Sequence, residues 1–315
     1  MNYKSFSDLS SDIRKNISEI QNKQFDLVVG LPRSGMVPAY IIALYLNIEC
    51  TDLRSFIDNK PLKKGSTRNF TRSINSPHEA KKILIVDDSI MSGLSLANDL
   101  KLIPSGLIKN ITTLAIYSST SSRDDVDVFL KYLPSPRVFE WNIFHHNFLS
   151  KTCVDIDGVL CVDPSEEDND DGDKYINFIL NATALFLPTT RIHSLVTSRL
   201  EKYRPETEQW LSQHNIIYDN LIMLDLPSKE ERQRLRAHGT HKAKYYKESE
   251  SKFFIESEAN QALKISQLTG KAVFCVDNNT MYNPSLISII RKNPKELKNY
   301  IHIQIKNILR PFKLV

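Results

Sequence analysis

The chain alternates short runs of β-branched and apolar residues with helical stretches, and the pattern occurs twice. In the first half this predicts helices at 36–46 and 92–102, between strands at 26–30, 82–87, 111–117 and 137–144. The second half predicts helices at 204–214 and 240–248, between strands at 151–155, 194–197, 221–224, 253–256 and 272–277. Such alternation is typical of parallel sheets covered by helices. The sequence therefore predicts an α/β protein with two parallel-sheet domains in tandem.

The length agrees with this organisation, because 315 residues at roughly 150 per domain suffice for two cores. We expect domains at 1–148 and 149–290, followed by a basic tail at 291–315. The four cysteines lack metal-binding spacing and are expected to be buried: Cys50, Cys153, Cys161 and Cys275. No apolar run resembles a signal peptide or a membrane span, so we expect a cytoplasmic protein.

Charge is unevenly distributed along the chain. The net charge of +4 is too small to imply a nucleic-acid partner. The segment 163–173, DPSEEDNDDGD, holds seven acids in eleven residues. It is interpreted either as a solvated loop or as a segment that lies near a metal or gates a substrate.

A first candidate site follows the strand predicted at 82–87. The segment 83–95 reads ILIVDDSIMSGLS, in which two acids precede small and hydroxyl residues and a helix. At the carboxyl end of a strand, backbone N–H groups and hydroxyls can hold an anion, whereas carboxylates suit hydroxyls or a cation. The pattern predicts a ligand with both a phosphate and a diol. Its candidate residues are Asp87, Asp88, Ser89, Ser92, Gly93 and Ser95.

This segment resembles the motif of the type I phosphoribosyltransferases, which bind 5-phosphoribosyl-1-diphosphate (PRPP). The resemblance implies that Asp87 and Asp88 bind the ribose hydroxyls, that the loop holds the 5-phosphate, and that Mg²⁺ accompanies PRPP. The segment 26–39, DLVVGLPRSGMVPA, resembles the diphosphate loop of the same family, which assigns Arg33, Ser34 and Gly35 to the leaving group. The basic segment 60–72 corresponds to the mobile loop of that family, or else is a solvated loop.

The acceptor is not specified by these motifs. Met91 stands where purine-type members have an acid, and Leu94 where orotate-type members have a threonine. Neither class of acceptor base is therefore supported. Trp141 either stacks on an acceptor or packs at the edge of a sheet.

A second candidate site follows the strand predicted at 151–155. The segment 153–160 reads CVDIDGVL, with two carboxylates two residues apart and a glycine. An aspartate can attack phosphorus when cations neutralise the phosphate oxygens and an acid protonates the leaving group. The segment resembles the nucleophile motif of the haloacid dehalogenase (HAD) phosphohydrolases. The resemblance implies that Asp155 is the nucleophile and Asp157 the general acid and base.

The remaining motifs of that family follow in order. LVTSR at 195–199 matches the phosphate-binding hydroxyl with Thr197, and Ser198 and Arg199 are further substrate-binding candidates. Lys242 matches the phosphate-binding lysine, with Lys244 as its rival. Glu256 matches the last Mg²⁺ ligand, with Glu258 as its rival. The predicted metal ligands of this site are Asp155, Asp157 and Glu256.

Together the two halves resemble bacterial polysaccharide ribofuranosyltransferases. This implies 5-phosphoribosyl transfer from PRPP to a saccharide or lipid-linked glycan, then Mg²⁺-dependent removal of the 5-phosphate to leave a β-ribofuranosyl residue. One alternative is nucleobase salvage combined with a nucleotidase. Another is a non-catalytic sensor of PRPP or nucleotides, against which the intact nucleophile motif argues.

The basic tail has two interpretations. Its apolar residues fall on one helical face: Leu297, Ile301, Ile305, Ile308 and Phe312. With the surrounding lysines and arginines, such a face could contact an anionic bilayer at the cytoplasmic side of a membrane. Alternatively, the tail packs on the second domain, since Pro311 and the β-branched isoleucines weaken the helix prediction.

Overall fold

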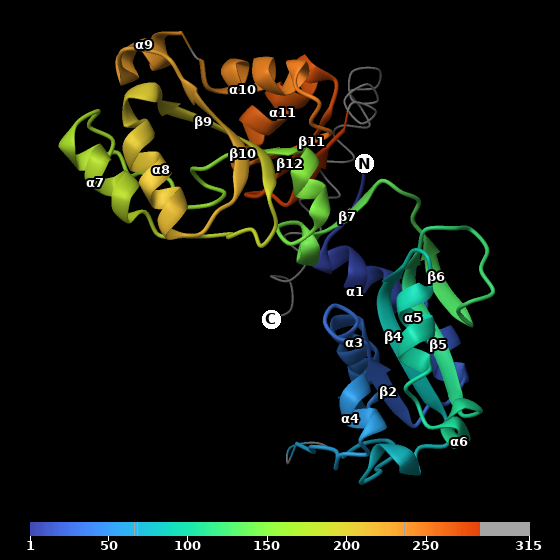
Figure 1. Cartoon of the computed structure of the whole chain (residues 1–315). Coiled ribbons are helices and arrows are strands. Elements are labelled where there is room, and N and C mark those ends of the chain that lie inside the picture. Colours follow the sequence, from blue (N-terminus) through green and yellow to red (C-terminus); the bar gives the residue numbers. More distant parts are fainter. Residues whose placement is uncertain (66, 68, 236, 284–315) are drawn as a thin grey trace, which may run out of the picture. The chain divides into compact units, whose positions relative to one another are not determined.

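The computed structural model describes residues 1–283 except 66, 68 and 236. The chain divides into two compact units, Met1–Trp141 and Asn142–Val315 (Figure 1). The tail predicted at 291–315 lies outside the described residues. Within the described part, no helix has the length and apolar character needed to cross a membrane.

The first unit is built on a five-stranded sheet in the order β3-β2-β4-β5-β6, with every pair parallel. Its strands are β2 (Leu27–Gly30), β3 (Glu49–Asp52), β4 (Ile83–Ile90), β5 (Ile111–Ser118) and β6 (Val128–Tyr132). Strands β3 and β6 escaped the sequence prediction, because β3 is largely polar and β6 is a half-exposed edge strand. The predicted α/β class with a parallel sheet is confirmed.

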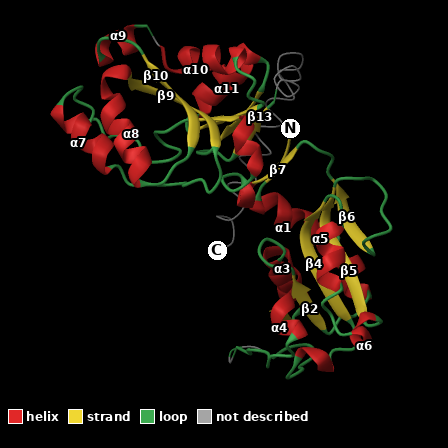
Figure 2. Cartoon of the chain, viewed as in Figure 1, coloured by secondary structure: helices red, strands yellow, loops and turns green. Residues whose placement is uncertain are grey.

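Helices cover both faces of this sheet (Figure 2). Alternate residues of β4 enter opposite cores, with Leu84 and Val86 on one face and Ile83 and Ile85 on the other. The first face packs on α1 (Phe6–Lys15), α2 (Ile17–Asn22) and α3 (Met36–Leu46). The second face packs on α4 (Leu53–Ile57), α5 (Leu94–Leu100) and α6 (Ser105–Ile108).

The strand order places two loops together at one edge of the sheet. Strand β2 lies between β3 and β4 in the sheet. The connection from β2 to β3 therefore runs to one side of β2, and the chain then crosses back to form β4 on its other side. In open parallel sheets, ligands bind at such a switch point, outside the carboxyl ends of the strands. The loops that follow β2 and β4 therefore face the same crevice.

A separate two-stranded parallel sheet joins the start of this unit to its end. It pairs β1 (Asn2–Lys4) with β7 (Arg137–Phe139). The predicted strand at 137–144 is therefore wrong in its length and in its sheet. A 3₁₀ helix at Glu140–Asn142 ends it, and β7 pairs with β1 instead of joining the five-stranded sheet.

The second unit has a six-stranded sheet in the order β10-β9-β8-β11-β12-β13, parallel except for β13. Its strands are β8 (Thr152–Val154), β9 (Ile192–Leu200), β10 (Tyr218–Leu224), β11 (Phe253–Glu256), β12 (Ala272–Cys275) and β13 (Thr280–Tyr282). Strands β8 and β11 are neighbours at the centre of the sheet. The residues that follow them are thereby brought to one edge.

One core of this unit joins the sheet to α10 (Ala237–Glu248) and α11 (Ala259–Thr269). A smaller core includes α7 (Asp173–Asn181) and the ends of β9 and β10. The remaining helices are α8 (Arg204–Gln213) and α9 (Lys229–Arg234). Cys153, Cys161 and Cys275 are buried, whereas Cys50 is half-buried.

Candidate functional site

The loops after β2 and β4 are tied together in the first unit. The backbone N–H of Leu31 donates to the carbonyl oxygen of Val86, and the Ser34 hydroxyl donates to Asp88 at 2.8 Å. Gly35 makes this approach possible, because a Cβ there would lie 2.6 Å from the Leu31 carbonyl oxygen and 2.8 Å from that of Val86. Arg33 is exposed at the tip of the loop.

The two acids of β4 have different surroundings. Asp88 is 4% exposed, and its two carboxylate oxygens accept from the Ser34 hydroxyl and, at 2.7 Å, from the Trp141 indole N–H. Asp87 accepts from the backbone N–H of Asp88 at 2.9 Å. Burial and the neighbouring charge of Asp88 raise the pKa of Asp87 to about 8. Asp88 is thus held by protein donors, while Asp87 retains a proton at neutral pH because its buried surroundings disfavour a second negative charge.

Trp141 packs against other aromatic rings in this unit. Its ring is stacked on Phe139, with centroids 4.9 Å apart, and Phe6 lies 5.4 Å away. Because its N–H is also bonded to Asp88, its surroundings favour the packing interpretation over the acceptor-stacking one.

The phosphate loop is shorter than predicted. Strand β4 continues to Ile90, so Ser89 lies inside the strand and the loop consists of residues 91–93. Arg123 donates to the Met91 carbonyl oxygen at 2.9 Å and pairs with Asp125. Ser92 and Ser95 are exposed on either side of Gly93, which precedes α5 with φ of 75°. The small and hydroxyl residues of the motif therefore border one loop.

Two cations of the basic segment 60–72 lie at the amino ends of the strands, opposite to the loops that follow β2 and β4. Arg72 pairs with Asp26, which directly precedes β2, and Lys64 lies 3.7 Å from Glu49 at the start of β3. Asp26 and Glu49 are buried acids, which attract these cations. The closure of this segment over the diphosphate stays a prediction.

Asp87 and Asp88 fit a cation or a diol. Two adjacent carboxylates, one with a raised pKa, attract either a metal ion or hydroxyl donors. These acids are the residues of this unit that would face Mg²⁺ when it accompanies PRPP.

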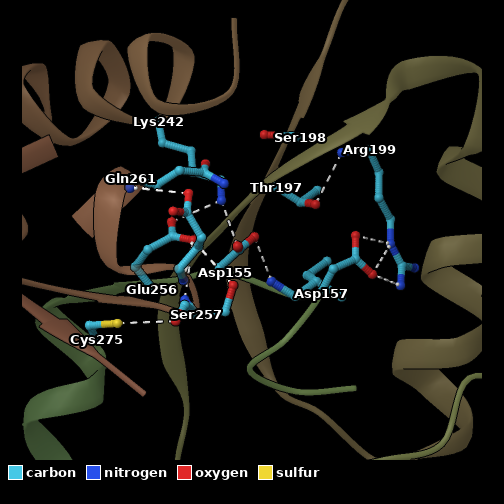
Figure 3. A network of polar contacts seen from close by, with 12 residues as sticks. Asp155, Asp157, Thr197, Ser198, Arg199, Lys242, Glu256, Ser257, Gln261 and Cys275 are labelled. Carbon is cyan, nitrogen blue, oxygen red and sulfur yellow. Dashed lines mark hydrogen bonds and ion pairs between the residues drawn. The ribbon is translucent and has the colours of Figure 1, made fainter. Parts of the chain in front are cut away.

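In the second unit a buried lysine lies between two buried carboxylates (Figure 3). The Lys242 ammonium on α10 lies 2.5 Å from Asp155, after β8, and 2.8 Å from Glu256 at the end of β11. Lys242, Asp155 and Glu256 are 2%, 4% and 0% exposed. Burial raises the pKa of Asp155 well above its usual range, and the ammonium opposes this shift. The three charges form one ion-pair network.

The turn after Asp155 requires a glycine. Gly158 has φ of 71°, and a Cβ there would lie 2.4 Å from the Cβ of Ser257. The turn brings Asp157 to Arg199, whose guanidinium donates to both carboxylate oxygens at 2.6 and 3.1 Å. Figure 3 shows the Asp157 side chain directed toward Arg199. Arg199 is fully buried and serves this carboxylate, not the pocket.

Ser198, not Thr197, presents the hydroxyl of this strand to the pocket. Strand β9 extends to Leu200, so successive side chains point in opposite directions. The Thr197 hydroxyl is fully buried and accepts from the backbone N–H of Arg199 at 3.1 Å. Ser198 lines the pocket. The assignment of Thr197 and Arg199 to a bound phosphate is thus not supported by the geometry.

Lys244 and Glu258, the alternatives to Lys242 and Glu256, have different surroundings. Lys244 is exposed, whereas Lys242 is buried against Asp155. Glu258 caps α11 by accepting from the backbone N–H groups of Asn260 and Gln261. The structure therefore brings Lys242 and Glu256, not their rivals, to the site.

The three predicted Mg²⁺ ligands do not come together. Asp157 is engaged by Arg199, and the ammonium of Lys242 occupies the space between Asp155 and Glu256. Among the described residues, no group of three histidine, cysteine or acidic side chains is arranged to hold a metal. The predicted triad therefore does not fit a metal ion, and we derive no step of the second site through one.

A pocket of about 240 Å³ opens beside Asp155. Sequence reasoning missed several of its lining residues, since no motif marks them: Tyr175, Arg232, His238 and Gln261. Burial, together with Arg232 and Lys242, lowers the pKa of His238 to about 4, so this side chain is neutral at pH 7.

The acids of the segment 163–173 have two kinds of surroundings: some bond to nearby parts of the chain, and one lines the pocket. Asp170 accepts from backbone N–H groups at the start of α7, and Asp171 accepts from Lys202 and Tyr203. Asp163 lines the pocket. One acid of the segment therefore faces the candidate site, while others hold local structure.

Comparison with known proteins identifies the first unit. Residues 2–150 match the family model of the phosphoribosyl transferase domain. The first unit therefore carries a phosphoribosyl transferase domain. No curated protein matches the chain.

Solved structures resemble part of the chain. Purine phosphoribosyltransferase from Pyrococcus horikoshii is 17% identical, with a TM-score of 0.31, over 44% of this chain and 92% of that one. Xanthine-guanine-hypoxanthine phosphoribosyltransferase from Helicobacter pylori is 20% identical, with a TM-score of 0.34, over 45% and 93%. A hypothetical protein from Neisseria gonorrhoeae with bound ppGpp is 12% identical, with a TM-score of 0.31, over 45% and 89%.

Asp87 makes the stability of the first unit dependent on pH. Its pKa is about 8 in the folded chain and about 4 in the unfolded chain, so the folded state retains a proton between these values. The resulting stability is complete below about pH 4 and is lost as the pH rises to about 8. Between pH 5 and pH 8, Asp87→Asn should therefore gain about 4 kcal/mol in the free energy of unfolding relative to the native chain, because Asn cannot lose a proton. Thermal unfolding of both proteins across this range measures the difference, and parallel curves would contradict the assignment.

Proposed function

We propose that the chain transfers a 5-phosphoribosyl group from PRPP to a saccharide acceptor and then removes the 5-phosphate, leaving a β-ribofuranosyl residue. The observation that carries this proposal is the presence of two sites with complementary chemistry in one chain. One site lies at the carboxyl ends of the parallel strands in the phosphoribosyl transferase domain, and the other surrounds the buried side chain of Asp155. The product of the first site would be a phosphomonoester, which is the substrate class expected for the second.

In the proposed first step, an acceptor hydroxyl oxygen attacks C1 of PRPP while the bond from C1 to the diphosphate breaks. The diphosphate leaves with the bonding electrons, and the hydroxyl proton passes to water. Asp87, with Asp88 beside it, accepts hydrogen bonds from the ribose diol. The phosphate loop at 91–93 holds the 5-phosphate, and Arg33 and its neighbours hold the diphosphate. Attack opposite the α-diphosphate gives a β-riboside. Mg²⁺ bound with PRPP supplies neutralisation of the departing charge.

In the proposed second step, a carboxylate oxygen of Asp155 attacks phosphorus and the bond to the sugar oxygen breaks. This gives an acyl-phosphate, which water then cleaves to inorganic phosphate and free Asp155. The Lys242 ammonium, 2.5 Å from Asp155, favours the ionised form of this carboxyl and so opposes the effect of its burial. Asp157 is proposed to protonate the departing sugar oxygen. To do so it must exchange a hydrogen bond with Arg199 for one to the substrate.

The side chains near the first site favour an acceptor that is not a nucleobase. Met91 and Leu94 are 66% and 68% exposed beside the phosphate loop, and neither can hydrogen-bond to a base. Trp141 is packed against Phe139, and its N–H is bonded to Asp88.

Replacing the proposed nucleophile should separate the two steps. With Asp155→Asn, PRPP consumption should continue, and the product should be heavier by one phosphate because no acyl-phosphate can form. Mass spectrometry of products from PRPP and oligosaccharide acceptors measures this. Asp219→Asn, at an exposed ion pair with Arg191, is the control and should behave as the native chain. If Asp155→Asn stops PRPP consumption, the two sites are not independent steps.

Replacing both acids of β4 should have the converse effect. Asp87→Asn with Asp88→Asn should lower transfer at least ~100-fold, because the ribose diol loses its acceptors. Hydrolysis of ribose 5-phosphate by the second unit should survive. Asp58→Asn, which removes a surface ion pair with Arg54, is the matched control. Unchanged diphosphate release by the double variant would exclude these acids from the transfer site.

Nucleobase salvage is the competing function to be tested directly. Purine and pyrimidine bases are incubated with PRPP and the native chain, and diphosphate release is compared with that produced by saccharides. The proposal expects release with saccharides and none above background with bases. Efficient release with a base would replace the proposed acceptor class.

A further inference from the structure

Arg232 is a buried cation on the wall of the second pocket. It lies on α9, is 7% exposed, and donates through Nη1 to the carbonyl oxygen of Ser198 at 2.9 Å. Its Nε–H is buried without a hydrogen-bond partner. A buried donor without a partner is destabilising, and more so when the group is charged.

The other buried cations of this region are already paired. Arg199 is bonded to Asp157, and Lys242 to Asp155 and Glu256. Within the described ranges, Arg232 forms no ion pair with a carboxylate. An unpaired buried guanidinium is costly unless an anion reaches it. Arg232 is therefore the cation of this pocket that a ligand can neutralise.

Two further polar atoms are buried without partners at the same pocket. They are the hydroxyl oxygen of Ser198 and the side-chain carbonyl oxygen of Gln261. The hydroxyl can donate to an anion, whereas the amide oxygen can only accept, which requires a donor such as an alcohol. His238 adds no charge at pH 7, because its pKa is about 4. The pocket therefore calls for a ligand with both an anionic group and a hydroxyl.

We propose that Arg232 selects a sugar phosphomonoester in this pocket. Its guanidinium, with the Ser198 hydroxyl, binds the phosphate dianion next to Asp155, and Gln261 accepts from a sugar hydroxyl. A phosphomonoester carries nearly two charges and three free oxygens at pH 7, whereas a diester carries one charge and two free oxygens, so the guanidinium attracts the monoester more strongly. This inference rests on the proposed phosphatase activity and adds the residue that selects its substrate.

Binding can be measured apart from turnover. The Asp155→Asn chain, which cannot form an acyl-phosphate, is titrated by calorimetry with ribose 5-phosphate and with its methyl diester. The phosphate loop of the first unit also binds phosphate, so the data are fitted with two sites. The site that persists when Asp87→Asn and Asp88→Asn are added in the first unit is assigned to the second pocket. We expect Arg232→Gln to weaken monoester binding there by about tenfold or more and to abolish the preference over the diester.

Two variants control for charge and for folding. Arg234→Gln removes a cation two residues away that is exposed and paired with Glu231, and it should leave binding unchanged. Arg232→Lys keeps the charge without the planar guanidinium and should give intermediate affinity. A preference for the monoester that survives in Arg232→Gln, with native unfolding behaviour, overturns the inference.

The outcomes also distinguish this inference from the proposed function. Arg232-dependent selectivity in a chain that hydrolyses no sugar phosphate would support the binding role and refute the phosphatase. Hydrolysis that proceeds with the native monoester preference in Arg232→Gln would support the phosphatase and refute the role of Arg232.

Discussion

The ion-pair network of Lys242 with Asp155 and Glu256 determines the organisation of the second unit. It joins α10 to the residues after β8 and at the end of β11, which are neighbouring strands. Removing one member of such a buried group leaves an uncompensated charge, which typically costs about 3–5 kcal/mol. The network therefore fixes the position of Asp155, and the Lys242 ammonium favours its charged form against the effect of burial. The proposed nucleophile depends on this arrangement.

Both units place acids at the carboxyl ends of parallel strands, but they balance the charge differently. In the first unit, Ser34 and Trp141 donate to Asp88, while Asp87 retains a proton that a cation could displace. In the second unit, cations pair with the acids, and Arg232 remains for a ligand. The first site thus suits hydroxyls or a cation, and the second suits an anion. These properties match the ribose diol of PRPP in the first proposed step and the phosphate of its product in the second.

The sequence predicted the motifs because they are local. Two acids after a strand and a glycine turn after Asp155 can be read from adjacent residues. The contacts that decide the role of each side chain could not be predicted from adjacent residues, because they depend on the length of a strand or join residues far apart in the sequence. Which of Thr197 and Ser198 faces the pocket depends on how far β9 extends, and the pairing of Asp157 with Arg199 joins residues 42 positions apart. For the basic segment 60–72, the sequence left open a loop that closes over the diphosphate and a solvated loop. It did not indicate the ion pairs of Arg72 with Asp26 and of Lys64 with Glu49.

The central claim is that one phosphate passes through both sites in order. PRPP labelled in its 5-phosphate is mixed with the native chain and an oligosaccharide acceptor, and the label is followed over a single turnover. The account predicts that label appears first on the acceptor and only afterwards as inorganic phosphate, after a lag. Release of labelled inorganic phosphate without acceptor, or without prior labelling of the acceptor, would contradict it.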